Sequence, residues 1–350
     1  MIHPSRGAEK GSASGRRTWL LLANQELAID TGRHVMIVDG HVHVFFEGSD
    51  PEEFFTGCAR LAAVIFNKES RETQDPQELL QTFMPVLGDP TADKLIGYMD
   101  EAGIDRAVLL PLDFFLGCDE PAVGEKKTIT IEEKNRLFTS FVAKHKGRLF
   151  SYFGIDPRRK GALELFRKGV EEWGMIGLKL HPTTGFYPHD PVCYPFYQAA
   201  QEMGVPVLIH SGTEPAPLKP MYSQPCFIDT VAADFPELKI IIAHCGHGWW
   251  EEAIDMATSK PNLYVDFSGW QSQYSGHPDY YYRSLRVALD MLGPWRVIFG
   301  TDGSMTNFMV WPKDWVAANR EPNSPSGIKF SQEEMEIVLG GAAARLYGWE

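Results

Sequence analysis

Short apolar segments rich in valine and isoleucine alternate with longer amphipathic segments from Val35 onward. The longer segments repeat their apolar residues at helical spacing, so the pattern predicts strand–helix units around a parallel sheet. Eight apolar segments are present, and eight units favour closure into an α/β fold, the (β/α)8 TIM barrel. The predicted strands are 34–39, 106–110, 149–154, 175–180, 205–209, 239–243, 263–266 and 296–300.

Residues that begin and end helices lie between these segments. The residues expected to cap the first turns are Thr91, Thr130, Asp190 and Ser331. The glycines expected to end helices with a positive φ are Gly103, Gly174 and Gly204. Their positions agree with the count of strand–helix units.

Two stretches are longer than a minimal barrel requires. About fifty residues separate the first strand from the Thr91 helix, and a proline-rich loop spans 211–224. Both follow strand carboxyl ends, where barrels build active sites. The first stretch contains Asp50-Pro51-Glu52-Glu53, which predicts a helix acting as a lid or substrate wall. We expect an N-terminal extension at 1–32 and one metal-dependent barrel at 33–350.

Composition and charge narrow the class of protein. The 44% apolar fraction is ample for a large core, and 33 Lys and Arg against 46 Asp and Glu give a net charge of −13. Such a charge repels nucleic acid and anionic membranes, so we expect neither as a partner. The cysteines are odd in number, scattered and without a Cys-x-x-Cys pair, which favours a reducing, cytoplasmic location. They are Cys58, Cys118, Cys193, Cys226 and Cys245.

Two histidines stand one residue apart at the end of the first predicted strand, in the sequence Val38-Asp39-Gly40-His41-Val42-His43. Strand alternation places His41 and His43 on the same face. There, two imidazole nitrogens can bind one divalent ion. A His-x-His pair alone is a weak signal, because surface histidines also pair by chance.

Further ionisable residues recur at other strand ends. His210 ends the fifth strand, His244 the sixth and Asp302 the eighth. A buried structural histidine or a helix-capping aspartate would explain any one of these residues. Neither structural role explains well why such residues recur at successive strand ends, so the set favours a polar site at the barrel mouth.

The fourth strand carries Gly177-Leu178-Lys179-Leu180-His181-Pro182, in which Lys179 and His181 share a face. A buried lysine must lose its charge, pair or be chemically altered, because an unpaired buried ammonium is costly. The structural alternative is an ion pair with an inward carboxylate such as Asp39 or Asp302.

As an ordered set, these motifs resemble the amidohydrolase superfamily over residues 36–348, specifically the amidohydrolase 2 branch related to aminocarboxymuconate semialdehyde decarboxylase. The motifs that carry the resemblance are His41-x-His43, Gly177 to Pro182 with Gly185-Phe186-Tyr187-Pro188, the His210 and His244 strand ends, Tyr264-Val265-Asp266-Phe267-Ser268-Gly269, and Gly300-Thr301-Asp302.

The resemblance implies a metal site and a mechanism. It implies that His41, His43, His210 and Asp302 hold a divalent metal, most simply Zn2+, with Mn2+ or Fe2+ as alternatives. Asp302 would also take a proton from the attacking water, and His244 would bind a second ion or act as acid or base. In two-metal relatives a carbamate on the lysine equivalent to Lys179 bridges the ions; one or two ions therefore remain open.

Candidate substrate residues are fainter in the sequence. Lys219 and Tyr222 lie on the 211–224 loop, within reach of a substrate carboxylate or phenolate, although a loop lysine is commonly only solvated. Trp249 follows His244 and would form an aromatic wall or pack a helix start. His181 is a further candidate beside Lys179.

Three functions stay open from the sequence. The leading one is a hydrolase in which metal-activated water attacks a C–N or C–O bond of a small organic acid, amide or lactone. The alternative is a metal-dependent, non-oxidative decarboxylase of an aromatic or enolic acid. A catalytically inactive barrel acting as a binding module is the third, but no expected ligand type is missing. We expect a small-molecule substrate and a homodimer.

Overall fold

The computed structural model describes residues 35–67, 75–114 and 129–349. The extension predicted at 1–32 lies outside the described residues. Residues Met36–Glu350 form one compact unit. Within the described part of the chain, no helix is long and apolar enough to cross a membrane.

The strands of the described chain are short and pair in parallel throughout. They fall into the orders β1-β2-β3 and β4-β5-β6-β7-β8-β9, and only Tyr152 separates β3 from β4. These two pieces therefore act as one barrel strand. The strands are β1 (Val38–Val42), β2 (Arg106–Leu109), β3 (Leu149–Ser151), β4 (Phe153–Gly154), β5 (Leu178–Leu180), β6 (Val207–Ile209), β7 (Ile240–Ile242), β8 (Leu263–Asp266) and β9 (Val297–Ile298).

Backbone hydrogen bonds join the first strand to the chain around the last. The Gly40 amide donates to the Phe299 carbonyl (2.9 Å), and the Asp302 amide donates to the His41 carbonyl (2.8 Å). A Cβ on Gly40 would lie 2.6 Å from an Ile298 methyl, so glycine permits this close approach. The predicted TIM barrel is confirmed.

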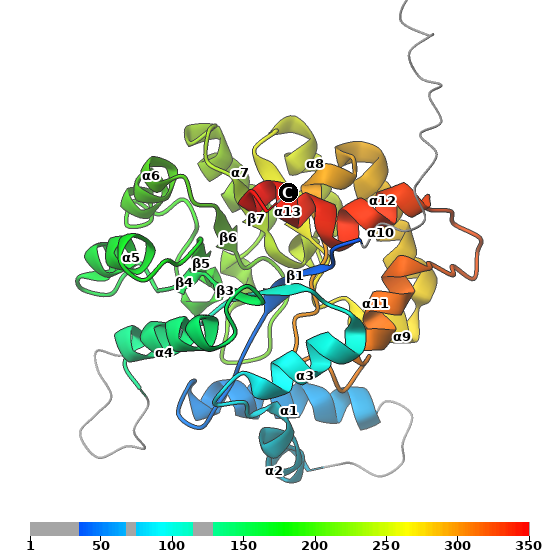
Figure 1. Cartoon of the computed structure of the whole chain (residues 1–350), viewed down its shortest axis with the longest axis horizontal. Coiled ribbons are helices and arrows are strands. Elements are labelled where there is room, and N and C mark those ends of the chain that lie inside the picture. Colours follow the sequence, from blue (N-terminus) through cyan, green and yellow to red (C-terminus); the bar gives the residue numbers. More distant parts are fainter. Residues whose placement is uncertain (1–34, 68–74, 115–128, 350) are drawn as a thin grey trace, which may run out of the picture. The chain divides into compact units, whose positions relative to one another are not determined.

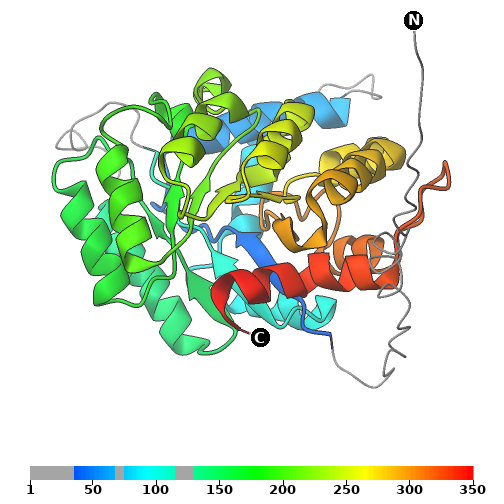
Figure 2. The same cartoon turned by 90° about the horizontal axis from the view of Figure 1, so that it is seen from above.

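Helices surround the strands in both views (Figures 1 and 2). The helices of the repeating units and of the C-terminal segment are α3 (Asp93–Ala102), α4 (Ile131–Lys144), α5 (Ala162–Glu171), α6 (Tyr194–Met203), α7 (Pro225–Asp234), α8 (Trp250–Ser259), α9 (Gln271–Gly276), α10 (Pro278–Leu292), α11 (Pro312–Arg320), α12 (Gln332–Glu336) and α13 (Ala342–Tyr347). Single turns are η1 (Pro182–Thr184), η2 (Pro220–Tyr222), η3 (Ala243–Gly246), η4 (Pro294–Arg296) and the π-type η5 (Ile337–Gly341).

Strand alternation decides which side chains point into the barrel. Leu208 and Ile241 belong to an inner apolar cluster, whereas Val207 and Ile209 belong to the cluster shared with the helices. A period of two therefore places His210 on the inner face with Leu208. Residues of α13 close the inner cluster at one end.

The insertion after β1 folds into two helices, α1 (Glu52–Asn67) and α2 (Pro76–Leu87). The helix predicted from Asp50-Pro51-Glu52-Glu53 is therefore confirmed, although its role as a lid or wall stays a prediction. Gly57 of α1 packs on the 211–224 loop so closely that a Cβ would lie 1.8 Å from the Ala216 carbonyl oxygen. An apolar cluster lies beneath this contact and consists of Phe45, Phe54, Phe55, Leu112, Phe114 and Leu218.

Two of the four predicted helix caps are wrong. Thr130 and Ser331 form complete capping boxes with the glutamates three residues later, as expected. The cap of α3 is instead Ala92 with a φ of 59°, and Asp190 accepts from the Tyr187 amide in a turn before α6. Short polar side chains also stabilise turns, which explains the error.

Strand bounds also differ from the prediction at the first strand. It spans Val38–Val42 rather than 34–39, so His41 lies inside the strand instead of after it. The glycines Gly103 and Gly204 end helices with φ values of 70° and 68°, as predicted. Gly174 also has a positive φ, 72°, but follows the last residue of α5 by three positions.

Gly154→Ala should destabilise the barrel. A Cβ at this position in β4 would lie 1.8 Å from the Pro111 carbonyl oxygen, so the backbone must move. We expect the free energy of unfolding to fall by about 1–3 kcal/mol. The control is Gly97→Ala on the exposed face of α3, where nothing lies within 4 Å; it should raise that free energy by about 0.5–1 kcal/mol. If both variants lost the same free energy of unfolding in urea titrations, close packing at Gly154 would not be the cause.

Glu334→Gln should reveal a pH-dependent contribution to stability. Arg286 of α10 holds Glu334 at 2.7 Å and lowers the pKa of this carboxyl to about 2, against desolvation that opposes the shift. Because the folded pKa is depressed, the contribution is present above the unfolded value and is lost as the pH falls towards about 2. We expect a loss of about 1 kcal/mol at neutral pH and none in acid. A loss that is independent of pH in denaturant titrations would contradict this.

Candidate metal centre

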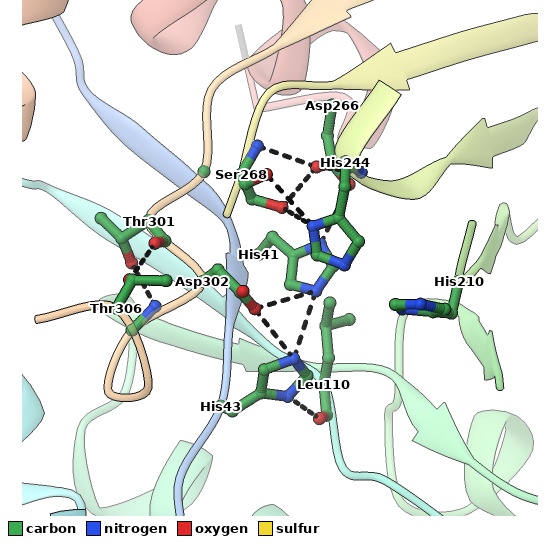
Figure 3. A network of polar contacts seen from close by, with 12 residues as sticks. His41, His43, Leu110, His210, His244, Asp266, Ser268, Thr301, Asp302 and Thr306 are labelled. Atoms are coloured by element: carbon green, nitrogen blue, oxygen red, sulfur yellow. Dashed lines mark hydrogen bonds and ion pairs between the residues drawn. The ribbon is translucent and has the colours of Figure 1, made fainter. Parts of the chain in front are cut away.

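The side chains of His41 in β1 and His43 just after it lie next to each other, with their rings turned towards each other (Figure 3). Their Nε2 atoms lie 3.2 Å apart. His41 Nδ1 lies 3.0 Å from Asp266 Oδ2, and His43 Nδ1 lies 2.8 Å from the Leu110 carbonyl oxygen. Since a carboxylate and a carbonyl oxygen only accept hydrogen bonds, both Nδ1 atoms carry the protons. The two Nε2 atoms therefore present lone pairs to each other.

Asp302 completes this group of donor atoms. Its Oδ1 lies 3.3 Å from His43 Nε2 and 3.7 Å from His41 Nε2. The residue follows β9 with a φ of 54°, a left-handed conformation that is uncommon outside glycine and is found at functional sites. Two nitrogen lone pairs and a carboxylate repel one another unless a positive charge lies between them. The chemistry of this donor set therefore fits a divalent metal ion.

Burial and neighbouring charges agree with these proton positions. Burial, reinforced by the Lys179 charge, lowers the pKa of His41 to about 3. Burial alone would raise the pKa of Asp302, but the close contacts with His43 and the other nearby histidines hold it below its usual range. The site thus holds neutral imidazoles beside an ionised carboxylate, the protonation states that metal ligands require.

Lys179 lies at the floor of this group and is 2% exposed. Its Nζ is 3.5 Å from His41 Nε2, and burial lowers its pKa to about 8. Among the described residues it forms no ion pair with Asp39 or Asp302, so that structural alternative is wrong. Asp39 instead accepts from the Thr301 hydroxyl at 2.5 Å. A carbamate on Lys179 stays a prediction.

His244 stands beside His41, with ring centroids 4.6 Å apart. Single ligand atoms of His41, His244 and Asp302 lie within 4.8 Å of one another. His244 follows the end of β7 and has a φ of 54°. This left-handed backbone directs its own ring into the site. The geometry suits either of the two roles expected for it, ligand or acid–base group.

His210 belongs to a second group of donor atoms, and its ring stands apart from the dashed network in Figure 3. Its buried Nε2 makes no hydrogen bond, although it lies 3.2 Å from Glu214 Oε1. The His181 ring stacks on that of His210 at 4.0 Å, and His181 Nδ1 bonds to Thr183 Oγ1. Burial raises the pKa of Glu214 to about 8.

Glu214 is a site residue that the sequence analysis missed. It lies on the irregular 211–224 loop, where no periodicity indicates which side chains point inward. Its position four residues after His210 was the one available signal. Asp266, for which the sequence favoured no role, is shown to hold His41.

The three remaining substrate candidates have no described contact with the histidines. Lys219 is exposed, and its amide donates to the Thr183 carbonyl. The Tyr222 ring packs on Tyr187 at 4.7 Å. Trp249 is half-buried immediately before α8. Their roles in substrate binding stay predictions.

Solved structures with the same fold are distant in sequence. 5-Carboxyvanillate decarboxylase from Sphingomonas paucimobilis has 18% identity and a TM-score of 0.60, covering 90% of this chain and 99% of its own. Dihydroxybenzoic acid decarboxylase from a Polaromonas species, solved with manganese and 2-nitroresorcinol, has 18% identity and a TM-score of 0.61, covering 90% and 97%. A probable 2-pyrone-4,6-dicarboxylic acid hydrolase from Acinetobacter baumannii has 13% identity and a TM-score of 0.57, covering 89% and 99%.

Sequence comparison assigns the family. No curated protein sequence matches the chain. The model of a family described as amidohydrolase matches residues 38–349, which includes all strands and all the donor residues above. The resemblance found in the sequence is thereby confirmed, and the chain belongs to the amidohydrolase family.

Proposed function

We propose that this protein is a metal-dependent carboxy-lyase that removes CO2 without oxidation from a small aromatic or enolic acid. The observation that carries the proposal is the convergence of His41 Nε2, His43 Nε2 and Asp302 Oδ1, which all point lone pairs at one place. Family membership and the decarboxylases among the similar folds support it.

A divalent ion held by His41, His43 and Asp302 would supply positive charge that stabilises an anionic substrate oxygen while the carboxyl group departs. His210 is the further ligand implied by the resemblance, and its buried Nε2 has no hydrogen bond to lose. Asp266 orients His41 through Nδ1, an arrangement that commonly fixes a ligating imidazole.

The remaining groups would transfer a proton and exclude water. Loss of CO2 leaves an electron pair on carbon, so a proton must reach that carbon from a positioned group. His244 is placed beside His41 and Asp302 for this transfer. The apolar cluster that contains Phe45 and Phe114 lies against both groups of donor atoms, since the Phe45 ring is 6.0 Å from that of His43 and the Phe114 ring is 5.1 Å from that of His181. It would exclude water from the reacting carbon.

The hydrolase reading is the second candidate, because a probable hydrolase is among the similar folds. We rank it below the decarboxylase, reversing the order favoured by the sequence alone. The inactive binding module receives no support, since the expected donor residues are all present at the barrel mouth.

Manganese is the first ion to test, because two decarboxylases of the same fold were solved with it. Zinc, the simplest expectation from the ligand types, is the second. Neutral imidazole and carboxylate ligands suit both ions.

The test is an assay of the full-length protein loaded with manganese or zinc. It is incubated separately with 2,6-dihydroxybenzoate, 5-carboxyvanillate and 2-pyrone-4,6-dicarboxylate, while released CO2 and products are measured. We expect metal-dependent CO2 release from at least one hydroxybenzoate. Hydrolysis of the pyrone without CO2 release would favour the second candidate, and no turnover of any of these acids would contradict the proposed substrate class.

A further inference from the structure

The segment from Asp266 to Trp270 contacts His244, and Figure 3 shows Asp266 and Ser268 beside its ring. The His244 amide donates to Asp266 Oδ1 at 3.0 Å, and Trp270 Nε1 donates to the His244 carbonyl at 2.9 Å. A Cβ on Gly269 would lie 3.1 Å from both His244 Nδ1 and Asp302 Oδ2. These contacts hold the left-handed backbone of His244 in place.

Ser268 supplies both polar neighbours of His244 Nδ1. Its Oγ lies 2.9 Å from Nδ1, and its carbonyl oxygen lies 3.1 Å away. The Ser268 hydroxyl donates its only proton to Asp266 Oδ1 at 2.5 Å. It therefore has only lone pairs left for His244, and the carbonyl oxygen can only accept.

Asp266 is able to receive that proton because it is ionised. Burial alone would raise its pKa, but His41 and the surrounding donors hold the pKa below its usual range. Oδ2 is occupied by His41 and Oδ1 by the Ser268 hydroxyl and two amides. One carboxylate thus orders the hydrogen bonds of both histidines.

We propose that Ser268, acting with Asp266, is a positioning residue that holds His244 in the tautomer with its proton on Nδ1, so that Nε2 presents a lone pair to the site. With its lone pair at Nε2, His244 accepts a proton there before it can give one. The proton leaves a substrate hydroxyl or a water oxygen, which keeps the bonding pair, and the imidazole becomes imidazolium. The resemblance left this direction open, since it implied only that His244 binds a second ion or acts as acid or base.

The decisive experiment reads the tautomer directly. Full-length protein labelled with 15N-histidine is loaded with zinc, which is diamagnetic, and two-bond 15N–1H correlation spectra are recorded at neutral pH. His244→Asn identifies the His244 signals by their loss. We expect a protonated Nδ1 and an unprotonated Nε2. A proton on Nε2, with or without one on Nδ1, would overturn the proposal.

Matched variants test the part played by the serine hydroxyl. Ser268→Ala should speed exchange of the Nδ1 proton with water by about tenfold, whereas Ser268→Thr, which keeps a hydroxyl, should restore slow exchange. Ser284→Ala is the control, because Ser284 is equally buried but donates to the Tyr280 carbonyl in α10. Equal exchange in wild type and Ser268→Ala would overturn the role of the hydroxyl.

A kinetic measurement, which rests on the proposed function, uses whichever acid releases CO2 fastest. Ser268→Ala should lower kcat about 10- to 100-fold, leave KM within about twofold and leave the metal content unchanged, with rescue by Ser268→Thr. An unchanged kcat would contradict the positioning role. If none of the acids releases CO2, the proposed function fails, while the spectra still decide the tautomer.

Discussion

Replacing His43 with alanine should strip the protein of its metal and lower kcat by about 10³-fold or more. The His43 imidazole supplies one of the three converging donor atoms, and its other nitrogen is already committed to the Leu110 carbonyl. A catalytic ion contributes several kcal/mol of charge stabilisation, and each ~1.4 kcal/mol corresponds to a factor of ten. Metal content by plasma mass spectrometry and CO2 release are measured on the same preparation.

The matched control for this loss is His277→Ala. His277 is an exposed histidine at the start of α10, so its removal should leave metal content and kcat unchanged. Metal retained at the wild-type level in His43→Ala would refute the assignment of this histidine as a ligand.

Lys134→Met should be among the most destabilising single substitutions. Lys134 in α4 is 3% exposed, and its ammonium lies 2.6 Å from Asp50 Oδ1 and 2.8 Å from the Leu112 carbonyl oxygen. Removing the cation leaves Asp50, 6% exposed, as an unpaired buried carboxylate. We expect the free energy of unfolding to fall by about 3–5 kcal/mol in urea titrations.

The same helix provides a control for this ion pair. Lys144 pairs with Asp93 at an equal 2.6 Å, but the two side chains are 47% and 56% exposed. Lys144→Met should therefore cost no more than about 1 kcal/mol. The double variant Lys134→Met/Asp50→Leu should recover part of the loss, because no buried charge then remains. Similar losses at both lysines would show that burial does not control the effect.

Periodicity predicted the features of the barrel that depend on regular backbone. Alternation along β5 and β6 places Lys179, His181 and His210 inward, as the structure has them. The eight-unit count was correct because each strand is an apolar run of its own. Strand bounds were less predictable, since the apolar residues before β1 continue the pattern although the strand itself begins at Val38.

The orientations of loop side chains could not be predicted from periodicity. Nothing in the 211–224 sequence shows that Glu214 turns towards His210 while Lys219 faces solvent. Those orientations depend on packing against α1, as the contact between Gly57 and Ala216 illustrates. Long-range hydrogen bonds are equally hidden: His41 and Asp266 are 225 positions apart.

The grouping of the donor atoms also required the structure. The resemblance placed His210 with His41, His43 and Asp302, whereas its Nε2 lies closer to Glu214 and His181. The two groups differ in their acid, because the pKa of Asp302 is held below its usual range whereas burial raises the pKa of Glu214 to about 8. The His210 ring is 5.0 Å from that of His244, so a rotation of the His210 side chain would bring it towards the first group.

The proposed metal centre is tested by an anomalous-scattering map of crystals of the manganese-loaded, full-length protein. We expect a peak at the point where His41 Nε2, His43 Nε2 and Asp302 converge, with about one ion per chain. A map with no peak there, or with its peak only among His181, His210 and Glu214, would contradict the proposed centre.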